Sequence, residues 1–536
     1  MGVSVILAKR TSKKNSMIKQ AITKISTVGF ISLVSYLPLC TPSQAAPQFA
    51  EKIAQTATPI ETKPEQNPNA AIKLVEQANV LREQNKLTEA VALYRQAISL
   101  NPGFVPAHYG LGVTLRQQGD IEGAIASHRR AIELDKNYTP AYYGLGIALY
   151  KRGDMVGAIN AYNAFIRLSK PDASLASTYY NLGLAEEQRN NLDGAVAAFQ
   201  KAVGLDPQYA LAHNGLGSVL RRQGDRKGAI TAFRQAITLA PQYATAHFSL
   251  GIALYEDKDY DGAIEAYKRA IAINNRFPNV FYNIGIAYDA KGDTDQAILS
   301  YRRSIEQDNK NADVYAALGT ALLKKEKAPE AVEVFRRSIE LNPKVAANYN
   351  GLGLALRRQG DLSGAIAAYE QAINLSPRYA AAYNNLGRAL SDQNKPVDAI
   401  AAFRKAIDAE PRNNVAYSNL GNLLRTQGDS AGAVEAFTRA IVYGKEELWV
   451  DYASLGLALA DQGKMRESLD AYNKAISLNP SYARAHFGLG ALYTMQGDIS
   501  SAIRSYQEAL RLYEADNNTE WVKRTRQALQ ALQGIT

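Results

Sequence analysis

Small and aromatic residues recur along this chain at a fixed spacing from about Ala71 onward. Between Gly112 and Gly490 one glycine follows another every 34 residues, except for a spacing of 37 after Gly146 and 35 after Gly421. An alanine, or in one case a serine, comes twelve residues after each glycine, and an aromatic residue usually follows four residues later. These intervals place the small and aromatic residues on the facing sides of two amphipathic helices.

Turn signals separate the helices that this pattern predicts. Gln-Gly-Asp sequences such as 118–120 and 359–361 end the first helix, because glycine readily adopts the left-handed conformation at a helix C-terminus. Asp-Pro, Asn-Pro and similar pairs such as 101–102 and 479–480 end the second helix. The sequence therefore predicts thirteen helix-turn-helix repeats over residues 71–516, numbered here 1 to 13. We expect the glycine and the alanine to let the two helices of a repeat pack closely, with aromatic rings filling the gaps beside that contact.

The spacing of these residues resembles the tetratricopeptide repeat. One repeat carries the family pattern in full, at the following positions: Tyr383, Leu386, Gly387, Ala399, Phe403, Ala406 and Pro411. The resemblance implies an all-α fold, a right-handed α-solenoid of tandem helix-turn-helix repeats whose concave groove binds other proteins. A three-residue insertion around 169–176 is a candidate bend or division of the array.

The C-terminal residues predict one more helix. Residues 517–536 read as an amphipathic capping helix, which covers the last apolar face as the end of a solenoid requires. Its inward residues are expected to be Trp521, Val522, Leu529 and Leu532.

The N-terminal residues resemble a targeting segment. Basic residues end at Lys24, an apolar stretch of about 15 residues follows, and small residues surround Ala45. We expect residues 1–45 to be a signal peptide cleaved after Ala45, followed by a flexible proline-containing linker over 46–70. An uncleaved signal anchor is the main alternative, and a lipoprotein modified at Cys40 or a cytoplasmic protein is the other. The expected location is exported, in the periplasm or cell envelope.

Net charge and chemistry exclude several classes of function. Six of the 61 basic residues and none of the 51 acidic residues lie in residues 1–46, so the rest of the chain is nearly balanced. This balance argues against a nucleic-acid partner. We find no phosphate-binding glycine loop, no nucleophile motif and no paired metal-ligand spacing, and so predict no catalytic residues, no cofactor and no metal.

The five histidines occupy positions of the repeat pattern. His108, His213, His247 and His486 take a position that tyrosine fills in other repeats, and His128 takes the later aromatic position. All five are therefore predicted to be packing residues.

One face of the first helices is the candidate binding surface. Counted from seven residues before each glycine, positions 2, 5, 6, 9, 12 and 13 share this face, and the family resemblance places it on the concave side. Basic residues recur at position 12 (Arg82, Arg116, Arg221, Arg357 and Arg425) and at position 13 (Lys151, Arg222, Lys324 and Arg358). Such a row suits carboxylates of an acidic segment, because guanidinium pairs bidentately with planar anions. The alternative is a set of solvated helix ends favoured by the helix dipole.

Asparagine at position 6 is a second candidate binding feature. The residues are Asn181, Asn283, Asn385 and Asn419, and they resemble the asparagine ladder of O-linked N-acetylglucosamine transferases. That resemblance implies that they hold the backbone of an extended peptide. The alternative is that small or amide side chains simply fit between crowded helices.

These observations favour a non-enzymatic scaffold or adaptor that binds extended or acidic segments of other proteins. An alternative hypothesis is the substrate-recruiting subunit of a separate enzyme such as a glycosyltransferase. Assembly into a homo-oligomer is a third hypothesis. Contact with a membrane is expected only through an uncleaved N-terminal anchor.

Overall fold

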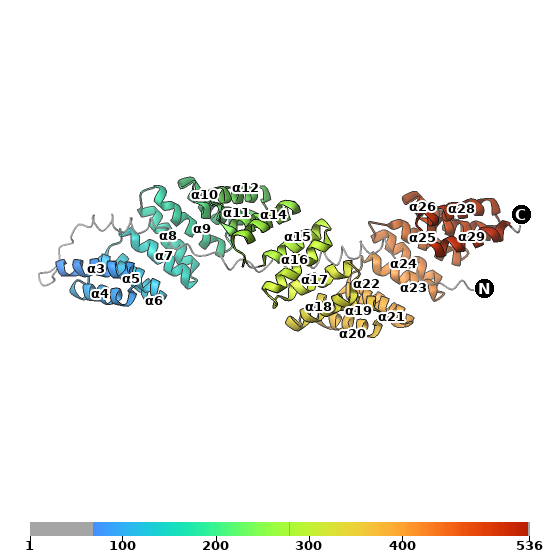
Figure 1. Ribbon diagram of the computed structural model, residues 1–536, viewed down its shortest axis with the longest axis horizontal. Coiled ribbons are helices and arrows are strands. Elements are labelled where there is room, and N and C mark those ends of the chain that lie inside the picture. Colours follow the sequence, from blue (N-terminus) through green and yellow to red (C-terminus); the bar gives the residue numbers. More distant parts are fainter. Residues whose placement is uncertain (1–67, 278, 534–536) are drawn as a thin grey trace. The chain divides into compact units, whose positions relative to one another are not determined.

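A computed structural model describes residues 68–277 and 279–533, which are almost entirely helical (Figure 1). The predicted signal peptide and nearly all of the predicted linker lie outside the described residues. The first helices of the repeats are α3 (Pro68–Glu83), α5 (Val105–Gln118), α7 (Thr139–Arg152), α9 (Ala176–Gln188), α11 (Ala210–Gln223), α13 (Ala244–Glu256), α15 (Val280–Lys291), α17 (Ala312–Lys324), α19 (Ala346–Gln359), α21 (Ala380–Asp392), α23 (Asn414–Thr426), α25 (Leu448–Asp461) and α27 (Ala483–Gln496).

The second helices of the repeats alternate with these. They are α4 (Leu87–Leu100), α6 (Ile121–Leu134), α8 (Met155–Leu168), α10 (Leu192–Leu205), α12 (Arg226–Leu239), α14 (Tyr260–Ile273), α16 (Thr294–Gln307), α18 (Ala328–Leu341), α20 (Leu362–Leu375), α22 (Pro396–Ala409), α24 (Ser430–Tyr443), α26 (Met465–Leu478) and α28 (Ile499–Ala515). The fold is therefore the predicted all-α solenoid of tandem helix pairs.

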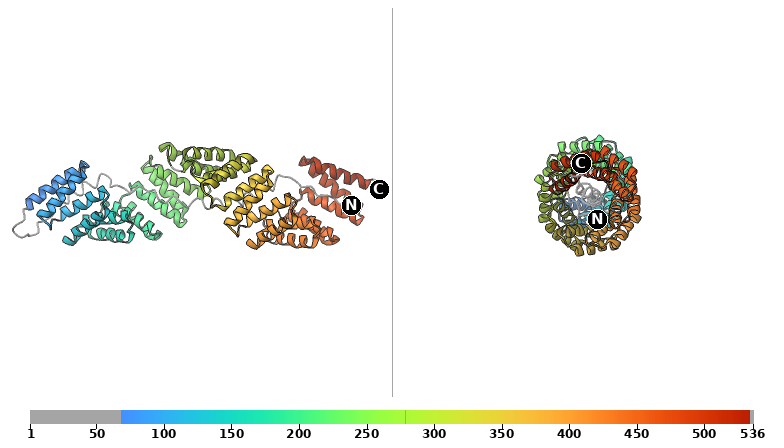
Figure 2. Two further views of the ribbon diagram at one scale, coloured as in Figure 1. Left: turned by 90° about the horizontal axis from the view of Figure 1, so that it is seen from below. Right: turned by 90° about the vertical axis from the view of Figure 1, so that its right-hand side faces the viewer.

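The helical array divides into two compact units, and the division falls within α16 of repeat 7. Among the described residues, one unit ends at Gln296 and the other begins at Ala297. Within each unit, neighbouring helices pack side by side in chain order (Figure 2). None of the described helices is both long and apolar enough to cross a membrane.

Turns inside the repeats have the predicted conformation. Gly119 follows α5 with φ of +92°, a left-handed backbone that a side chain would disfavour. Asp120 then begins α6, and its Oδ1 accepts a hydrogen bond from the backbone N–H of Gly123 at 2.8 Å. Asp361 and Gly364 form the same cap in repeat 9, at 2.8 Å. One turn sequence therefore both ends the first helix and starts the second.

Buried aromatic rings fill the space that glycines of the first helices leave open, and the ring of Phe199 lies between two of these glycines. A Cβ atom added at Gly183 or at Gly215 would lie 2.7 Å from the ring of Phe199, which is closer than real contacts allow. Gly183 belongs to the first helix of the ring's own repeat, and Gly215 to the first helix of the next repeat. From the spacing we expected the glycines to admit a neighbouring helix and the rings to lie beside that contact. Instead, the rings lie directly against the glycines.

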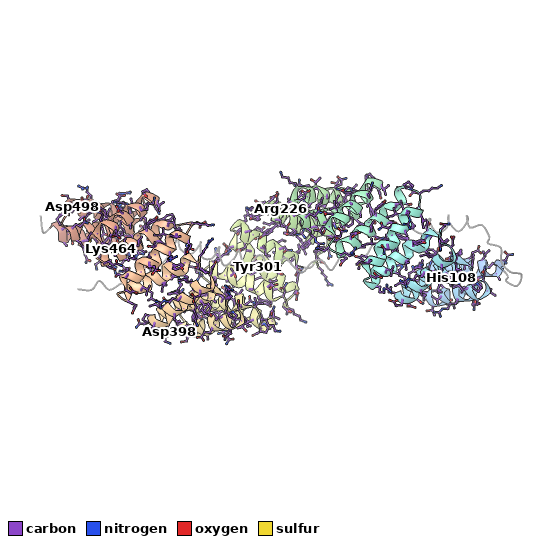
Figure 3. The ribbon with its side chains drawn as sticks, turned by 180° about the vertical axis from the view of Figure 1, so that it is seen from behind. His108, Arg226, Tyr301, Asp398, Lys464 and Asp498 are labelled. Carbon is purple, nitrogen blue, oxygen red and sulfur yellow. The ribbon has the colours of Figure 1, made fainter. Side chains whose placement is uncertain are left out.

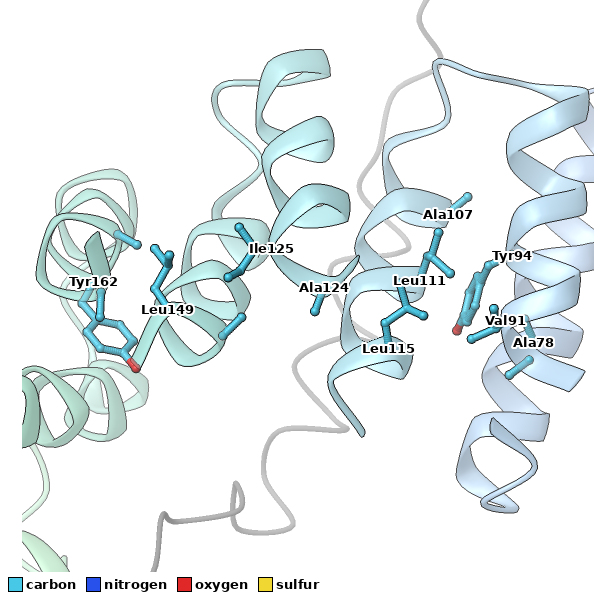
Figure 4. Close-up of a cluster of buried hydrophobic side chains, with 14 of the residues drawn as sticks. Ala78, Val91, Tyr94, Ala107, Leu111, Leu115, Ala124, Ile125, Leu149 and Tyr162 are labelled. Atoms are coloured by element: carbon cyan, nitrogen blue, oxygen red, sulfur yellow. The ribbon is translucent and has the colours of Figure 1, made fainter. Parts of the chain in front are cut away.

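Figure 4 shows buried side chains of the first hydrophobic cluster. Tyr94 of α4 is fully buried and lies with Ala78, Leu111 and Leu115 in one hydrophobic cluster. Burying an aromatic side chain of this size contributes roughly 2–3 kcal/mol to stability. Because the ring contacts the following repeat, no repeat completes its core alone.

The inserted residues between α8 and α9 form a short 3₁₀ turn, η1 (Ala173–Leu175). The side chain of Asp172 accepts a hydrogen bond from the backbone N–H of Ser174 at 2.8 Å, and Leu175 is buried. The hydrophobic cluster that begins at Ala71 continues past this turn to Ala198. The core is therefore continuous at the insertion, and the boundary between the two units lies elsewhere.

The first and last described helices, α3 and α29 (Thr519–Gln533), lie where the sequence predicted the two ends of the array. Helix α3 begins at Pro68, inside the predicted linker, because proline is well suited to the first turn of a helix. At the other end, α29 packs on α28 and buries Leu529 and Leu532. Trp521 stacks on Tyr513 with ring centroids 5.5 Å apart, and Val522 packs beside them. The predicted capping helix and its inward residues are confirmed.

Candidate protein-binding face

Positions 2, 5, 6, 9, 12 and 13 of the first helices are called the first-helix face below. At position 12 of this face, three of the predicted arginines form ion pairs with a carboxylate at position 13 of the following repeat. Arg221 Nη1 lies 2.7 Å from Glu256 Oε1, Arg357 Nη2 lies 2.6 Å from Asp392 Oδ2, and Arg425 Nη1 lies 3.1 Å from Asp461 Oδ2. The arginine and its partner are 35 or 36 residues apart in sequence. Each pair therefore links two consecutive repeats.

Two predicted arginines at position 13 also bind within the chain. Arg222 Nη1 lies 3.1 Å from Glu187 Oε1, and its Nη2 donates to Asn190 Oδ1 at 2.7 Å. Burial raises the pKa of Glu187, and the hydrogen bond and charge of Arg222 lower it only in part. The guanidinium of Arg358 donates a hydrogen bond to the carbonyl oxygen of Leu323. These side chains therefore connect repeats and have little capacity left for a partner.

Arg388, at position 9 of repeat 10, was not among the predicted site residues. Burial, followed by the charge of neighbouring Arg357, lowers the pKa of its guanidinium to about 10. The Asp392 carboxylate acts in the opposite direction and raises that pKa. Asp392 therefore stabilises more than one guanidinium, which a motif read within a single repeat does not show.

Arg82 and Arg116 differ from these residues. Both are half-buried, and within residues 68–277 and 279–533 neither forms an ion pair with a carboxylate. Arg116 is surrounded by the tyrosines Tyr109, Tyr143 and Tyr162 and by Arg82. Among the predicted arginines, these two have the charge available for an external anion.

The predicted asparagines lie between consecutive repeats. Asn385 Nδ2 donates to Asn350 Oδ1 at 2.9 Å, and Asn419 Nδ2 donates to Asn384 Oδ1 at 2.8 Å. In the other unit, Asn181 Nδ2 donates to the hydroxyl of Tyr143 at 3.2 Å. Each bond joins position 6 of one repeat to position 5 of the preceding repeat. Asn283 is buried like Asn181. The amides of Asn181, Asn385 and Asn419 therefore hold repeats together, and a role of the four asparagines in binding a peptide backbone stays a prediction.

Family models provide the decisive comparison. Models described as tetratricopeptide repeat match residues 143–210, 214–276, 384–447, 483–516 and 312–345. A model described as TPR repeat matches residues 78–115, 113–153, 288–326, 353–394 and 456–497. Together they span most of the helical array. The chain belongs to the tetratricopeptide repeat family.

Solved structures of other tetratricopeptide repeat proteins are similar at low identity. A structure of the APC/C hetero-tetramer Cut9-Hcn1 is 17% identical, with 85% of this chain and 96% of that chain covered and a TM-score of 0.38. The yeast Tom70 structure is 16% identical, with 75% and 97% covered and a TM-score of 0.35. MamA is 29% identical over 30% of this chain and 94% of its own, with a TM-score of 0.28. No curated protein matches the sequence.

Four histidines of the tetratricopeptide repeats bind the turn that precedes their helix. His108 Nε2, labelled in Figure 3, lies 3.0 Å from the carbonyl oxygen of Pro102. His213, His247 and His486 make the same contact at 3.0, 3.0 and 2.9 Å. A carbonyl can only accept, so the imidazole N–H donates. These residues were predicted to act by packing alone, and the sequence signal that was missed is a proline six residues earlier.

His128 takes the ring position of its tetratricopeptide repeat and is fully buried. Neither of its ring nitrogens has a hydrogen-bond partner among the residues that the structure describes. Burial, followed by the charge of Arg116, lowers its pKa to about 3. It is the packing residue that the sequence predicted. Within the described part of the chain, no cluster of His, Cys, Asp or Glu could hold a metal ion.

Proposed function

We propose that this chain is an exported scaffold that holds extended segments of other proteins, acidic ones above all, along its first-helix face. The coarser statement follows from its family, because tetratricopeptide repeats generally bind other proteins. The chain is a protein–protein interaction scaffold. A solenoid offers a continuous face along successive repeats, which suits a partner segment in an extended conformation.

The observation that supports this face is its repeated series of polar and charged side chains. Charged groups occupy position 12 or 13 in consecutive repeats, for instance Arg82, Arg116 and Lys151. In contrast, the small and aromatic positions face the helix of the same repeat or of the next one. The first-helix face therefore carries charged groups at regular intervals, beside apolar residues at position 9 such as Val113 and Leu354. We further propose that the scaffold acts without catalysis of its own.

Site-specific photo-crosslinking tests the choice of face. A photoreactive residue at Val113 or Leu354, both at position 9, should crosslink to partner proteins in cells that make the protein. The same residue at Arg129 or Glu435, which are exposed on second helices, serves as the matched control and should give few crosslinks. Crosslinks concentrated on the second helices would contradict the proposed face.

The proposed export depends on the N-terminal sequence, which lies outside the described residues. The mature protein should begin at Ala46, since small residues precede this position and Pro47 follows it. Intact-mass measurement of the protein isolated from its cells checks this expectation. A mass that includes residues 1–45, found in a soluble cytoplasmic fraction, would refute export by a cleaved signal.

A further inference from the structure

Three cations occupy the same edge of the first-helix face in consecutive repeats at the N-terminal end of the array. Arg82 and Arg116 stand at position 12 of repeats 1 and 2, and Lys151 stands at position 13 of repeat 3. Their helices follow one another on this face, since α3 contacts α5 and α5 contacts α7. Within the described residues, none of the three forms an ion pair with a carboxylate.

In three later repeats of the first-helix face, the arginine at position 12 is paired with a carboxylate of the next repeat, and repeats 2 and 3 lack that carboxylate. Arg221, Arg357 and Arg425 occupy the position of Arg116, and each is paired with an acid 35 or 36 residues later. The residue 35 positions after Arg116 is Lys151, and the residue 35 positions after Arg82 is Gln117. The same interval therefore supplies a carboxylate in the later repeats and a second cation or an amide in the first ones.

The surroundings of Arg116 disfavour its charged guanidinium, because no carboxylate among the described residues compensates for burial and for the charge of Arg82. Burial lowers the pKa of its guanidinium, as does the charge of Arg82, whereas the nearby tyrosines Tyr109, Tyr143 and Tyr162 raise it. Burial and the charge of Arg116 also lower the pKa of Lys151. Like charges that are partly removed from water repel one another and gain from any anion that joins them.

We propose that Arg82, Arg116 and Lys151 form a binding site for acidic side chains of an extended partner segment. Carboxylates of the partner take the place that Glu256, Asp392 and Asp461 occupy in the other repeats. This inference rests on the proposed scaffold function and locates its preference for acidic segments in repeats 1 to 3.

The geometry of the array also specifies the spacing of the acids. Packed helices lie roughly 8–10 Å apart, and an extended chain in the polyproline II conformation advances about 3.1 Å per residue with three residues per turn, so that side chains three residues apart lie on one side. Acidic side chains about three residues apart therefore match cations on neighbouring first helices. A suitable probe is a fluorescein-labelled nine-residue peptide with glutamate at positions 1, 4 and 7 and glycine or serine elsewhere. The matched control peptide has glutamine at the same three positions.

Binding of these peptides to the full chain, measured by fluorescence anisotropy, tests the site. The glutamate peptide should bind at least about 10-fold more tightly than the glutamine peptide, as expected for charge-assisted hydrogen bonds. Arg116→Gln should weaken binding by about 10-fold. Arg425→Gln removes an arginine from the same position, where it is already paired, and should change binding by less than about 2-fold. Equal losses in the two variants, or equal binding of the two peptides, would overturn the proposal.

Lys151→Glu supplies a second test. This variant should be more stable than the wild type, so unfolding cannot explain a loss of binding. It places a carboxylate at the position of Glu256, Asp392 and Asp461, so that Arg116 acquires an internal partner. The variant should unfold at a higher temperature than the wild type and lose binding of the glutamate peptide. Unchanged binding would refute the site. Crosslinks from Val113 and Leu354 that persist in that case would leave the scaffold function standing and reject only this location.

Discussion

Repeats 2 and 3 differ from repeats 9 and 10 at two equivalent positions. In repeat 9, Arg357 at position 12 is paired with Asp392, and the fully buried ring is Tyr369. In repeat 2, Arg116 at position 12 has no carboxylate partner in the described part of the chain, and the buried ring is His128. The charge of Arg116 even acts on His128, lowering its pKa further after burial.

This difference shows that identical positions of a repeat need not have identical roles. Local rules of packing and charge pairing are usually broken where a protein binds something, because the cost there is offset by a ligand. The later repeats satisfy their charges internally and are built to hold the array together. The first repeats leave theirs unsatisfied. This contrast separates the part of the first-helix face that links repeats from the part that we propose binds a partner.

The largest expected effect concerns the ring positions. Phe403→Ala should destabilise its repeat by roughly 3–5 kcal/mol, since it removes a fully buried ring from a closely packed site. His128→Ala should cost clearly less, because it also removes two buried nitrogens without partners. Hydrogen exchange of the amides in α22 and α6 measures each local free energy. Equal losses of stability in the two variants would show that His128 packs as well as phenylalanine does. That result would contradict the difference between repeats 2 and 10.

A pH titration should sharpen the same contrast. His128 has a folded pKa of about 3 against an ordinary value of 6.5, so the unfolded chain binds the proton first. Stability is therefore fully present above about pH 6.5 and is lost progressively as the pH falls toward 3. At pH 5 the loss is roughly 2 kcal/mol relative to pH 7. The urea midpoint of the N-terminal repeats should fall accordingly in the wild type and much less in His128→Phe. An equal fall in both proteins would contradict this explanation.

The smallest expected effect concerns stability. Replacing Arg357 and replacing Arg116 should change the free energy of unfolding differently. Arg357→Gln should destabilise the chain by about 1 kcal/mol, because it breaks a partly exposed ion pair. Arg116→Gln should leave stability unchanged or raise it by up to about 0.5 kcal/mol, because it removes repulsion by Arg82. Thermal unfolding of the two variants at low and high salt measures both changes. Losses of the same size would mean that Arg116 has an internal partner after all.

Periodicity within one repeat predicted the helices, the Gln-Gly-Asp turns and the buried ring positions, because these depend on residues close together in sequence. It did not predict the partners of the arginines. The acids that bind Arg221, Arg357 and Arg425 lie one repeat further along, at an interval of 35 or 36 residues. A search at that interval would have found them and would have shown that Arg116 is followed by Lys151 instead.

Contacts that depend on packing were harder to anticipate. The glycine positions were identified, but their function was assigned to close helix approach, whereas the structure fills that space with a ring such as Phe199. Likewise, the sequence placed Asn385 and Asn419 on the first-helix face but could not show that each donates to an asparagine of the preceding repeat. Side-chain direction at a crowded helix interface decides both cases.

The position of each ring between two consecutive first helices has a consequence for how such a chain grows. A copied segment of one repeat length brings a ring and the first helix on one side of it, and the first helix of the next repeat covers the other side, so the new unit fits between its neighbours without any change to them. Gene duplication can therefore lengthen the array in whole repeats. An inserted or deleted fraction of a repeat would separate a ring from the first helices that it contacts. The three extra residues between α8 and α9 are tolerated because they lie in the turn between repeats, where no ring is displaced.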